Sequence, residues 1–269
     1  MSAAAPTGGL ARVARVLRLV ARGWVAHTKH LSSSGFFILI STIQPVIFAA
    51  IAFYMFRAGD HPGALAYAAI GAGMLGVWST TLVGSGQALT LLRFAGMLEL
   101  LIAAPAPFVF VLAPITLATA TVGLYSLVAT LAWGWLLFDI PLPVEHPWLL
   151  AVAVPATVLA LGMLGLVLAS VFVRFRHANG LTNLLDYPMW LASGLLVPVG
   201  LLPGWVRPLS WLFPTTWGAQ AIRESIMGGR PVPAIGACLL LAAAYFGVGV
   251  LTLRRFELLA RRRASLALT

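Results

Sequence analysis

The amino-acid sequence predicts an all-α integral membrane protein with six transmembrane helices. Hydrophobic residues make up 61% of its 269 residues and charged residues only 9%, whereas about a quarter of the residues in soluble domains are charged. So few charges cannot cover a surface that faces water, and lipid must therefore be the main solvent. Crossing the hydrocarbon takes about 20 helical residues. Six apolar runs are that long: Gly35–Met55, Leu65–Val83, Phe108–Phe138, Trp148–Val173, Leu181–Val199 and Val232–Leu253.

The segment before the first span, residues 1–34, contains an amphipathic stretch. At about 100° per residue its apolar and basic side chains fall on opposite arcs of a helix. The apolar arc is Leu10, Val13, Ala14, Leu17, Val20, Ala21 and Trp24, and the basic arc is Arg12, Arg15, Arg18 and Arg22. This pattern predicts an interfacial helix on the inner membrane surface, with its arginines among lipid phosphates. A targeting peptide and a basic disordered tail are the alternatives.

The basic residues are concentrated on one side of the predicted spans. Lys and Arg near membrane segments stay cytoplasmic. Most of the 17 basic residues lie in segments of one side: Arg12, Arg15, Arg18, Arg22, Lys29, Arg93, Arg174, Arg176, Arg254, Arg255, Arg261, Arg262 and Arg263. Both termini are therefore predicted to be cytoplasmic, in a multi-pass protein of the cell's inner (plasma) membrane. The net charge of +10 does not indicate nucleic acid, because no segment is polar enough to form a basic soluble face.

The inner loop between the second and third spans reads RFAGMLELLIAAPAP over residues 93–107. Its LELLIAA part is too apolar to lie fully in water, so the loop predicts a short amphipathic helix on the cytoplasmic face. Joined firmly to two spans, such a helix can transmit a rigid push, with Arg93 and Glu99 as polar anchors. The prolines that follow, Pro105, Pro107 and Pro114, predict a bend at the start of the third span.

The predicted spans contain a single Asp, Glu, Lys, Arg or His residue, Asp186, and it shares a helical face with Asn183 at three-residue spacing. An intramembrane charge is expensive and is usually retained for function. Asp186 is therefore either part of a cytoplasmic gate, or of an ion pair with Arg174 or Arg176, or it is solvated near the interface. Gln44 either faces a transport path, as Asn183 can, or bonds to a neighbouring helix.

The outer segment between the fifth and sixth spans, residues 201–230, is too polar and too rich in proline to cross the membrane. Its aromatic residues favour the membrane–water boundary; they are Trp205, Trp211, Phe213 and Trp217. We predict one or two short re-entrant helices here that dip into the outer leaflet. The second runs from about Thr216 to Met227 and ends at Gly228 and Gly229. An exposed loop is the alternative.

The sequence lacks the motifs of an energy-converting or catalytic site. It has no GxxxxGK[ST] phosphate loop and a single lysine, Lys29, so it cannot bind ATP in that manner. Its five histidines lie outside the apolar runs and have no metal-binding spacing, and no GxSxG nucleophile elbow occurs. No inverted repeat or filter motif indicates a secondary carrier or a channel.

Two segments resemble those of ABC-2 type permeases. The inner loop is similar to their run of arginine, glycine, glutamate, leucine and proline, with Met97 where threonine often follows the glycine. The positions are Arg93, Gly96, Glu99, Leu100 and Pro105. The second segment resembles their sequence of a basic loop, a span, a Ser-Gly pair, a proline, a Leu-Pro-x-Trp motif, a further proline and an arginine. The matching positions are Arg174, Ser193, Gly194, Pro198, Leu202, Pro203, Trp205, Pro214 and Arg223. With the amphipathic start and six spans, the resemblance covers nearly the whole chain.

The resemblance implies a permease subunit, not an enzyme, whose inner loop is a coupling helix that fits a cleft on a nucleotide-binding subunit. It implies two ATPase subunits that hold ATP and magnesium, no cofactor on this chain, and a second permease, identical or related. Residues 35–253 would be the ABC-2 transmembrane domain and 254–269 a basic cytoplasmic tail. The path would lie between the permeases, lined by spans one, two and five.

Few buried charges favour an amphipathic or hydrophobic cargo, namely a drug, a natural product or a lipid. Within the same family, export of a polysaccharide or glycolipid is the alternative. An ATPase-independent carrier or a membrane enzyme is the alternative from another class.

Overall fold

The computed structural model of the chain describes residues 9–33, 35–56, 62–94, 107–140, 142–172 and 178–266. Over these residues the secondary structure is helical, without strands, so the predicted all-α class is confirmed. The elements are α1 (Gly9–Ser32), α2 (Gly35–Phe56), α3 (Pro62–Phe94), α5 (Val109–Phe138), α6 (Pro147–Phe172), α7 (Ala178–Ala192), the 3₁₀ helix η1 (Val199–Leu201), α8 (Arg207–Leu212), α9 (Pro214–Met227) and α10 (Pro231–Leu266).

Four helices in the described part of the chain are long and apolar enough to cross a membrane: Gly63–Gly86 of α3, Val109–Phe138, Pro147–Phe172 and Pro231–Leu258 of α10. They match the predicted second, third, fourth and sixth spans. Helix α2 occupies the position of the predicted first span. Helix α7, in the fifth, has 15 residues, fewer than the roughly 20 that cross the hydrocarbon. The protein is therefore an integral membrane protein, and the count of six spans stays a prediction.

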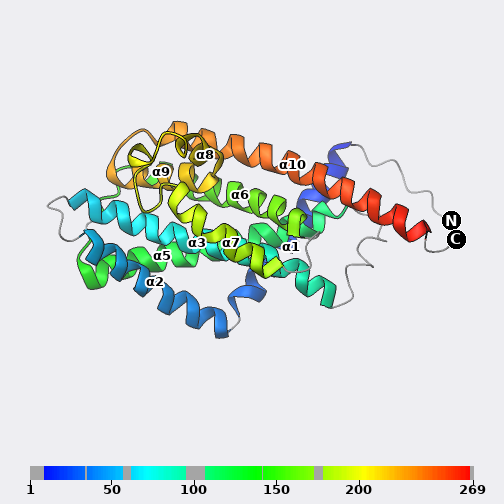
Figure 1. The fold of residues 1–269 in the computed structure, drawn as a ribbon, viewed down its shortest axis with the longest axis horizontal. Coiled ribbons are helices and arrows are strands. Elements are labelled where there is room, and N and C mark those ends of the chain that lie inside the picture. The colour runs from blue at the N-terminus through cyan, green and yellow to red at the C-terminus, as the bar shows by residue number, and fades with distance from the viewer. Residues whose placement is uncertain are drawn as a thin grey trace.

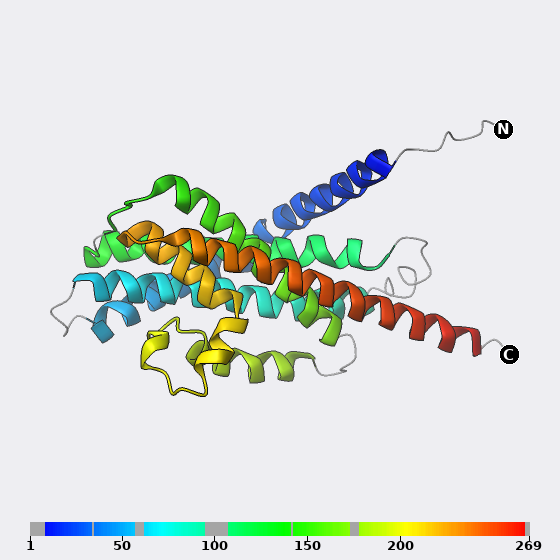
Figure 2. The ribbon, with the colours of Figure 1, turned by 90° about the horizontal axis from the view of Figure 1, so that it is seen from above.

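The long helices form an elongated bundle (Figure 1). Helix α3 packs along α5, α10 packs along α6, and α2 lies against both α5 and α3. The carboxyl ends of α3 and α10 face one end of this bundle, and the short helices α8 and α9 lie at the other (Figures 1 and 2). Segments that the sequence assigns to one side of the membrane therefore share one end of the bundle. That this end is cytoplasmic stays a prediction.

Helix α1 is a single helix that contacts α5 and leaves the bundle obliquely (Figure 2). The Nε1 atom of Trp24 donates a hydrogen bond to Oγ1 of Thr121 at 2.9 Å. Ala14, Leu17 and Ala21 of the predicted apolar arc are exposed, so these side chains are free to contact lipid. The predicted helix is present, and its position on the inner surface of the membrane stays a prediction.

Small residues bring α3 and α5 close together. A Cβ atom on Gly123 would lie 2.9 Å from Cα of Val77, and one on Gly76 would overlap the hydroxyl group of Ser126. Lipid tails are as apolar as the helices, so transmembrane helices associate through close packing, which small residues permit. The α3–α5 pair is the most extensively packed pair in the described bundle, and α2 and α6 pack against both of its helices.

Candidate functional site

Helix α7 ends at Ala192, whereas the fifth span was predicted to continue to Val199. The prediction is therefore wrong over the last part of that span. Gly194 has a φ angle of +73°, a left-handed conformation that glycine adopts without steric cost. The chain consequently leaves the helix here. The last carbonyl groups of a helix have no partner within it, and at this end they receive hydrogen bonds from other helices.

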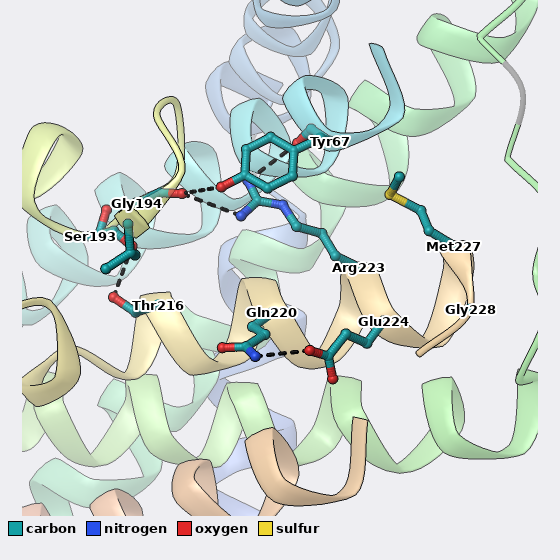
Figure 3. Close-up of a pocket in the computed structure, with 10 residues that line it drawn as sticks. Tyr67, Ser193, Gly194, Thr216, Gln220, Arg223, Glu224, Met227 and Gly228 are labelled. Carbon is teal, nitrogen blue, oxygen red and sulfur yellow. Dashed lines mark hydrogen bonds between the residues drawn. The ribbon is translucent and has the colours of Figure 1, made fainter. Parts of the chain in front are cut away.

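Two hydroxyl groups from the α8–α9 region supply part of these hydrogen bonds. The Oγ atom of Ser210, on α8, donates to the carbonyl oxygen of Ala192. The Oγ1 atom of Thr216, on α9, donates to the carbonyl oxygen of Ser193 at 2.8 Å, as Figure 3 shows. The end of α7 is thereby attached to both short helices.

Arg223, on α9, is the centre of this arrangement and is only 8% exposed. Its Nη1 atom donates to the carbonyl oxygen of Gly194 at 3.2 Å. Its Nη2 atom donates to the carbonyl oxygens of Leu195 at 2.7 Å and Tyr67 at 3.2 Å. The hydroxyl group of Tyr67 donates to the same Gly194 oxygen at 3.0 Å (Figure 3). We call Arg223, Tyr67, Gly194 and Leu195 the arginine cluster; it joins α3, α9 and the chain after α7.

The charge of Arg223 is compensated by dipoles. Burial lowers its pKa to about 10, so the guanidinium group is still protonated at neutral pH. Its partners are three carbonyl oxygens and the ring of Tyr67, whose centroid lies 3.4 Å from the guanidinium carbon. A cation is stabilised at the carboxyl end of a helix and over an aromatic face. The Nε atom of Arg223 is buried and has no hydrogen-bond partner among the described residues.

Gly71, on α3, has no side chain, and the arginine cluster occupies the space that a side chain would fill. A Cβ atom at this position would lie 2.7 Å from Nη2 of Arg223 and would overlap the carbonyl oxygen of Leu195. The contact between α3 and the chain after α7 therefore requires a residue without a side chain.

A cavity of about 370 Å³ lies beside the arginine cluster. Its wall is formed by Tyr67, Ser193, Gly194, Val199, Thr216, Gln220, Arg223, Glu224, Met227 and Gly228 (Figure 3). The Nε2 atom of Gln220 donates to Oε1 of Glu224 at 2.8 Å. The cavity wall thus carries a carboxylate as well as the buried cation.

The residues predicted for the outer re-entrant region lie in or near this site. Pro214 begins α9, a position that suits proline because the first amide of a helix needs no partner within it. Pro203 and Trp205 lie between η1 and α8. The side chain of Trp205 is 74% exposed, as expected of a residue at the membrane–water boundary. The short helices are present, and their insertion into the outer leaflet stays a prediction.

Asp186 links α7 to α3. Its carboxylate oxygens accept hydrogen bonds from Oγ of Ser79 at 3.1 and 3.2 Å, and Nε1 of Trp190 donates to one of them at 3.1 Å. These contacts place a polar link between two helices of the predicted path. The ion pair proposed for Asp186 is untested, because Arg174 and Arg176 lie outside the described residues.

The other predicted site residues are not brought together by the described structure. Gly96, Glu99, Leu100 and Pro105 of the coupling segment lie outside the described residues, and Arg93 is placed near the end of α3. Gln44 lies half-buried on α2, and Asn183 lies on α7. The roles assigned to these residues stay predictions.

The residues that α3 contributes to the site were not singled out from the sequence: Tyr67, Gly71 and Ser79. Each lies inside the apolar run of α3, and its partners lie far along the chain, on α7, on α9 or just after α7. Ser193 and Gly194 carried a local signal, because a Ser-Gly pair interrupts the apolar run of the fifth predicted span.

The bundle and its apolar spans define a polytopic integral membrane protein. A sequence model of the family described as ABC-2 type transporter matches residues 30–227, which is more than half of the chain and includes α2 to α9. The chain belongs to the ABC-2 type transporter family. It is thus a permease-type membrane domain, and in this family the ATPase is normally a separate subunit. A comparison with curated proteins found no match.

Proposed function

We propose that this chain is the permease subunit of an ATP-driven exporter. With a second permease, identical or related, it would form the path for an amphipathic or hydrophobic compound such as a drug, a natural product or a lipid. The observation that carries the proposal is the ABC-2 family match over residues 30–227. The apolar composition, with only 9% charged residues, supports an apolar cargo rather than a free ion or sugar.

The proposed complex contains two permeases and two ATPase subunits that hold ATP and magnesium. The path lies between the permeases and is lined by α2, α3 and α7, the first, second and fifth predicted spans. Helix α2 supports this arrangement because it packs on α3 and α5 and leaves an exposed apolar stripe for lipid or for a second permease. The stripe is formed by Ile43, Ile47, Ile51 and Tyr54.

ATP binding drives the cycle in this proposal. It draws the two ATPase subunits together, and each pushes on residues 93–105 of its permease. The push shifts the population between inward-facing and outward-facing states, which requires that ATP favours one of them.

Purification of the tagged chain from its own host in mild detergent tests this function. We expect an ATPase subunit with a phosphate-binding loop to copurify, and its rate of ATP hydrolysis to change when the permease is removed and then added back. An ATPase-independent carrier predicts transport in liposomes that hold this chain alone. Such transport, or the absence of a copurifying ATPase, would refute the proposal.

Substitution of Glu99 by alanine, or of Gly96 by valine, is expected to uncouple ATP hydrolysis from export while membrane insertion stays normal. A hydrogen bond to a charged group contributes roughly 1.5–3 kcal/mol, so loss of the Glu99 anchor should weaken binding of residues 93–105 to the cleft on the ATPase by roughly 10- to 100-fold. The change that the permease causes in the rate of ATP hydrolysis should fall as a result. The measurement is the hydrolysis rate of the complex with each variant.

The matched control for the Glu99 variant is Glu145→Ala, which removes an exposed carboxylate from the loop between α5 and α6. It should leave hydrolysis unchanged. Equal effects of Glu99→Ala and Glu145→Ala would contradict a coupling role for residues 93–105.

A further inference from the structure

Helix α5 begins without a capping side chain of its own. Its N-cap residue is Phe108, with a φ angle of −59° and no side-chain hydrogen bond to the cap. The first amide groups of a helix have no partner within it, and most helices satisfy one of them with Ser, Thr, Asp or Asn at this position. Phe108 has no oxygen to offer, and its side chain is 0% exposed. The amides of Phe110 and Val111 donate to the carbonyl oxygens of Pro107 and Phe108, whereas the amide of Phe108 itself takes an acceptor from elsewhere.

That acceptor is Glu257, on α10. Its Oε1 atom accepts a hydrogen bond from the backbone amide of Phe108 at 2.8 Å. A carboxylate is favourable at the amino end of a helix, where the helix dipole is positive, and a hydrogen bond to an ionised acceptor is stronger than a neutral one. Glu257 is also the only acidic residue between Arg254 and Thr269, a segment rich in arginine.

This hydrogen bond joins parts of the bundle that otherwise have little contact. Helix α10 packs against α6 and α9 and has few contacts with α5. Its carboxyl end and the start of α5 lie at the same end of the bundle (Figures 1 and 2). The Glu257–Phe108 bond is thus a polar link between the carboxyl-terminal helix and the point at which the chain enters α5.

We propose that Glu257 is a positioning residue for coupling, which caps α5 from α10 and makes the two helices respond together to ATP. The inference rests on the proposed function, because it requires an ATPase that pushes on residues 93–105. That segment joins the end of α3 to the start of α5, so its displacement acts on both of these helix ends. Glu257 passes the displacement to α10 and, through the packing of α10 on α9, toward the short helices at the other end of the bundle. Without the carboxylate, the first turn of α5 frays and absorbs the displacement.

Hydrogen–deuterium exchange of the permease–ATPase complex, with and without ATP, tests the proposal. In the wild-type chain we expect ATP to change exchange both at the start of α5 and in the cytoplasmic part of α10. In Glu257→Ala the ATPase should still copurify and hydrolyse ATP. The change in hydrogen–deuterium exchange that ATP causes should persist at the start of α5 and be lost in α10. A purely structural role would alter exchange equally with and without ATP.

Two further variants make the result interpretable. Glu257→Gln keeps a neutral acceptor and should restore most of the ATP-dependent change in α10, which also covers the case in which Glu257→Ala fails to fold. Leu258→Ala changes an exposed neighbour and should behave as the wild type does.

An ATP-dependent change in α10 that is the same in wild type, Glu257→Ala and Glu257→Gln would overturn the role of Glu257 and leave the proposed function intact. If the wild-type chain binds no ATPase, both are overturned.

Discussion

Replacement of Arg223 by methionine is expected to destabilise the folded protein by about 3 kcal/mol. The substitution removes the guanidinium hydrogen bonds to the carbonyl oxygens of Gly194, Leu195 and Tyr67, and a hydrogen bond to a charged group contributes roughly 1.5–3 kcal/mol. The Gly194 oxygen keeps its hydrogen bond from the hydroxyl group of Tyr67. Removal of a buried cation offsets part of this cost. For a chain of this size, the change corresponds to a fall in Tm of roughly 6–12 °C. The fall in Tm is measured by heating the purified protein in detergent and recording, by gel filtration, the fraction that stays monodisperse at each temperature.

Two other arginine substitutions complete this test. The first shows whether the charge of Arg223 or the geometry of its guanidinium group stabilises the folded protein, and the second is a control. Arg223→Lys keeps the charge, but an ammonium group lacks the planar fork that reaches several carbonyl oxygens at once, so an intermediate loss is expected. Arg207→Met is the matched control. Arg207 also donates to carbonyl oxygens, those of Leu202 and Gly200, but it is exposed. Equal falls in Tm for Arg223→Met and Arg207→Met would show that the arginine cluster does not hold this end of the bundle together.

The long helices are the part of the fold that the sequence predicts best. The predicted run Phe108–Phe138 is found as α5, Val109–Phe138, and Trp148–Val173 is found as α6, Pro147–Phe172. The reason is physical: a backbone in hydrocarbon must satisfy its own hydrogen bonds, so a long apolar run has to be helical. A local signal also predicted the end of α9, because Gly228, with a φ angle of +81°, follows its last residue.

The end of α7 could not be predicted in the same way. The residues after Ala192 read SGLLVPV and continue the apolar run, so hydropathy extends the span to Val199. The helix stops earlier because its terminal carbonyl groups are satisfied by Ser210, Thr216 and Arg223. These donors come from other helices, and neither periodicity nor hydropathy contains information about them.

The polar contacts of the site have the same limitation. Asp186 was recognised as an unusual residue, but its partner Ser79 lies in a different apolar run, and the spacing of residues on one helix does not reveal a partner on another. Arg223 was matched to the ABC-2 pattern, which gives its position and not its contacts. The predicted coupling segment, residues 93–105, differs from these residues. Its assignment depends on resemblance and on its predicted amphipathic character, and not on a contact.

Replacement of Gly71 by alanine is expected to destabilise the protein by about 3 kcal/mol, although alanine favours a helix over glycine by about 1 kcal/mol. The new Cβ atom would lie 2.7 Å from Nη2 of Arg223 and would overlap the carbonyl oxygen of Leu195. Overpacking costs about 1–3 kcal/mol, and the charged hydrogen bond between these two groups would be lost as well, at roughly 1.5–3 kcal/mol. The fall in Tm measures the effect.

Gly247→Ala separates this steric effect from helix propensity. Gly247 lies within α10, and a Cβ atom there would have no atom within 4 Å apart from its own helix, so the same chemical change should be neutral or stabilising. The contact with Nη2 is absent in Arg223→Met, whereas the overlap with the Leu195 oxygen remains, so Gly71→Ala should destabilise Arg223→Met by less than it destabilises the wild type. Full additivity of the two substitutions would mean that Gly71→Ala acts through the overlap with the Leu195 oxygen and not through Arg223.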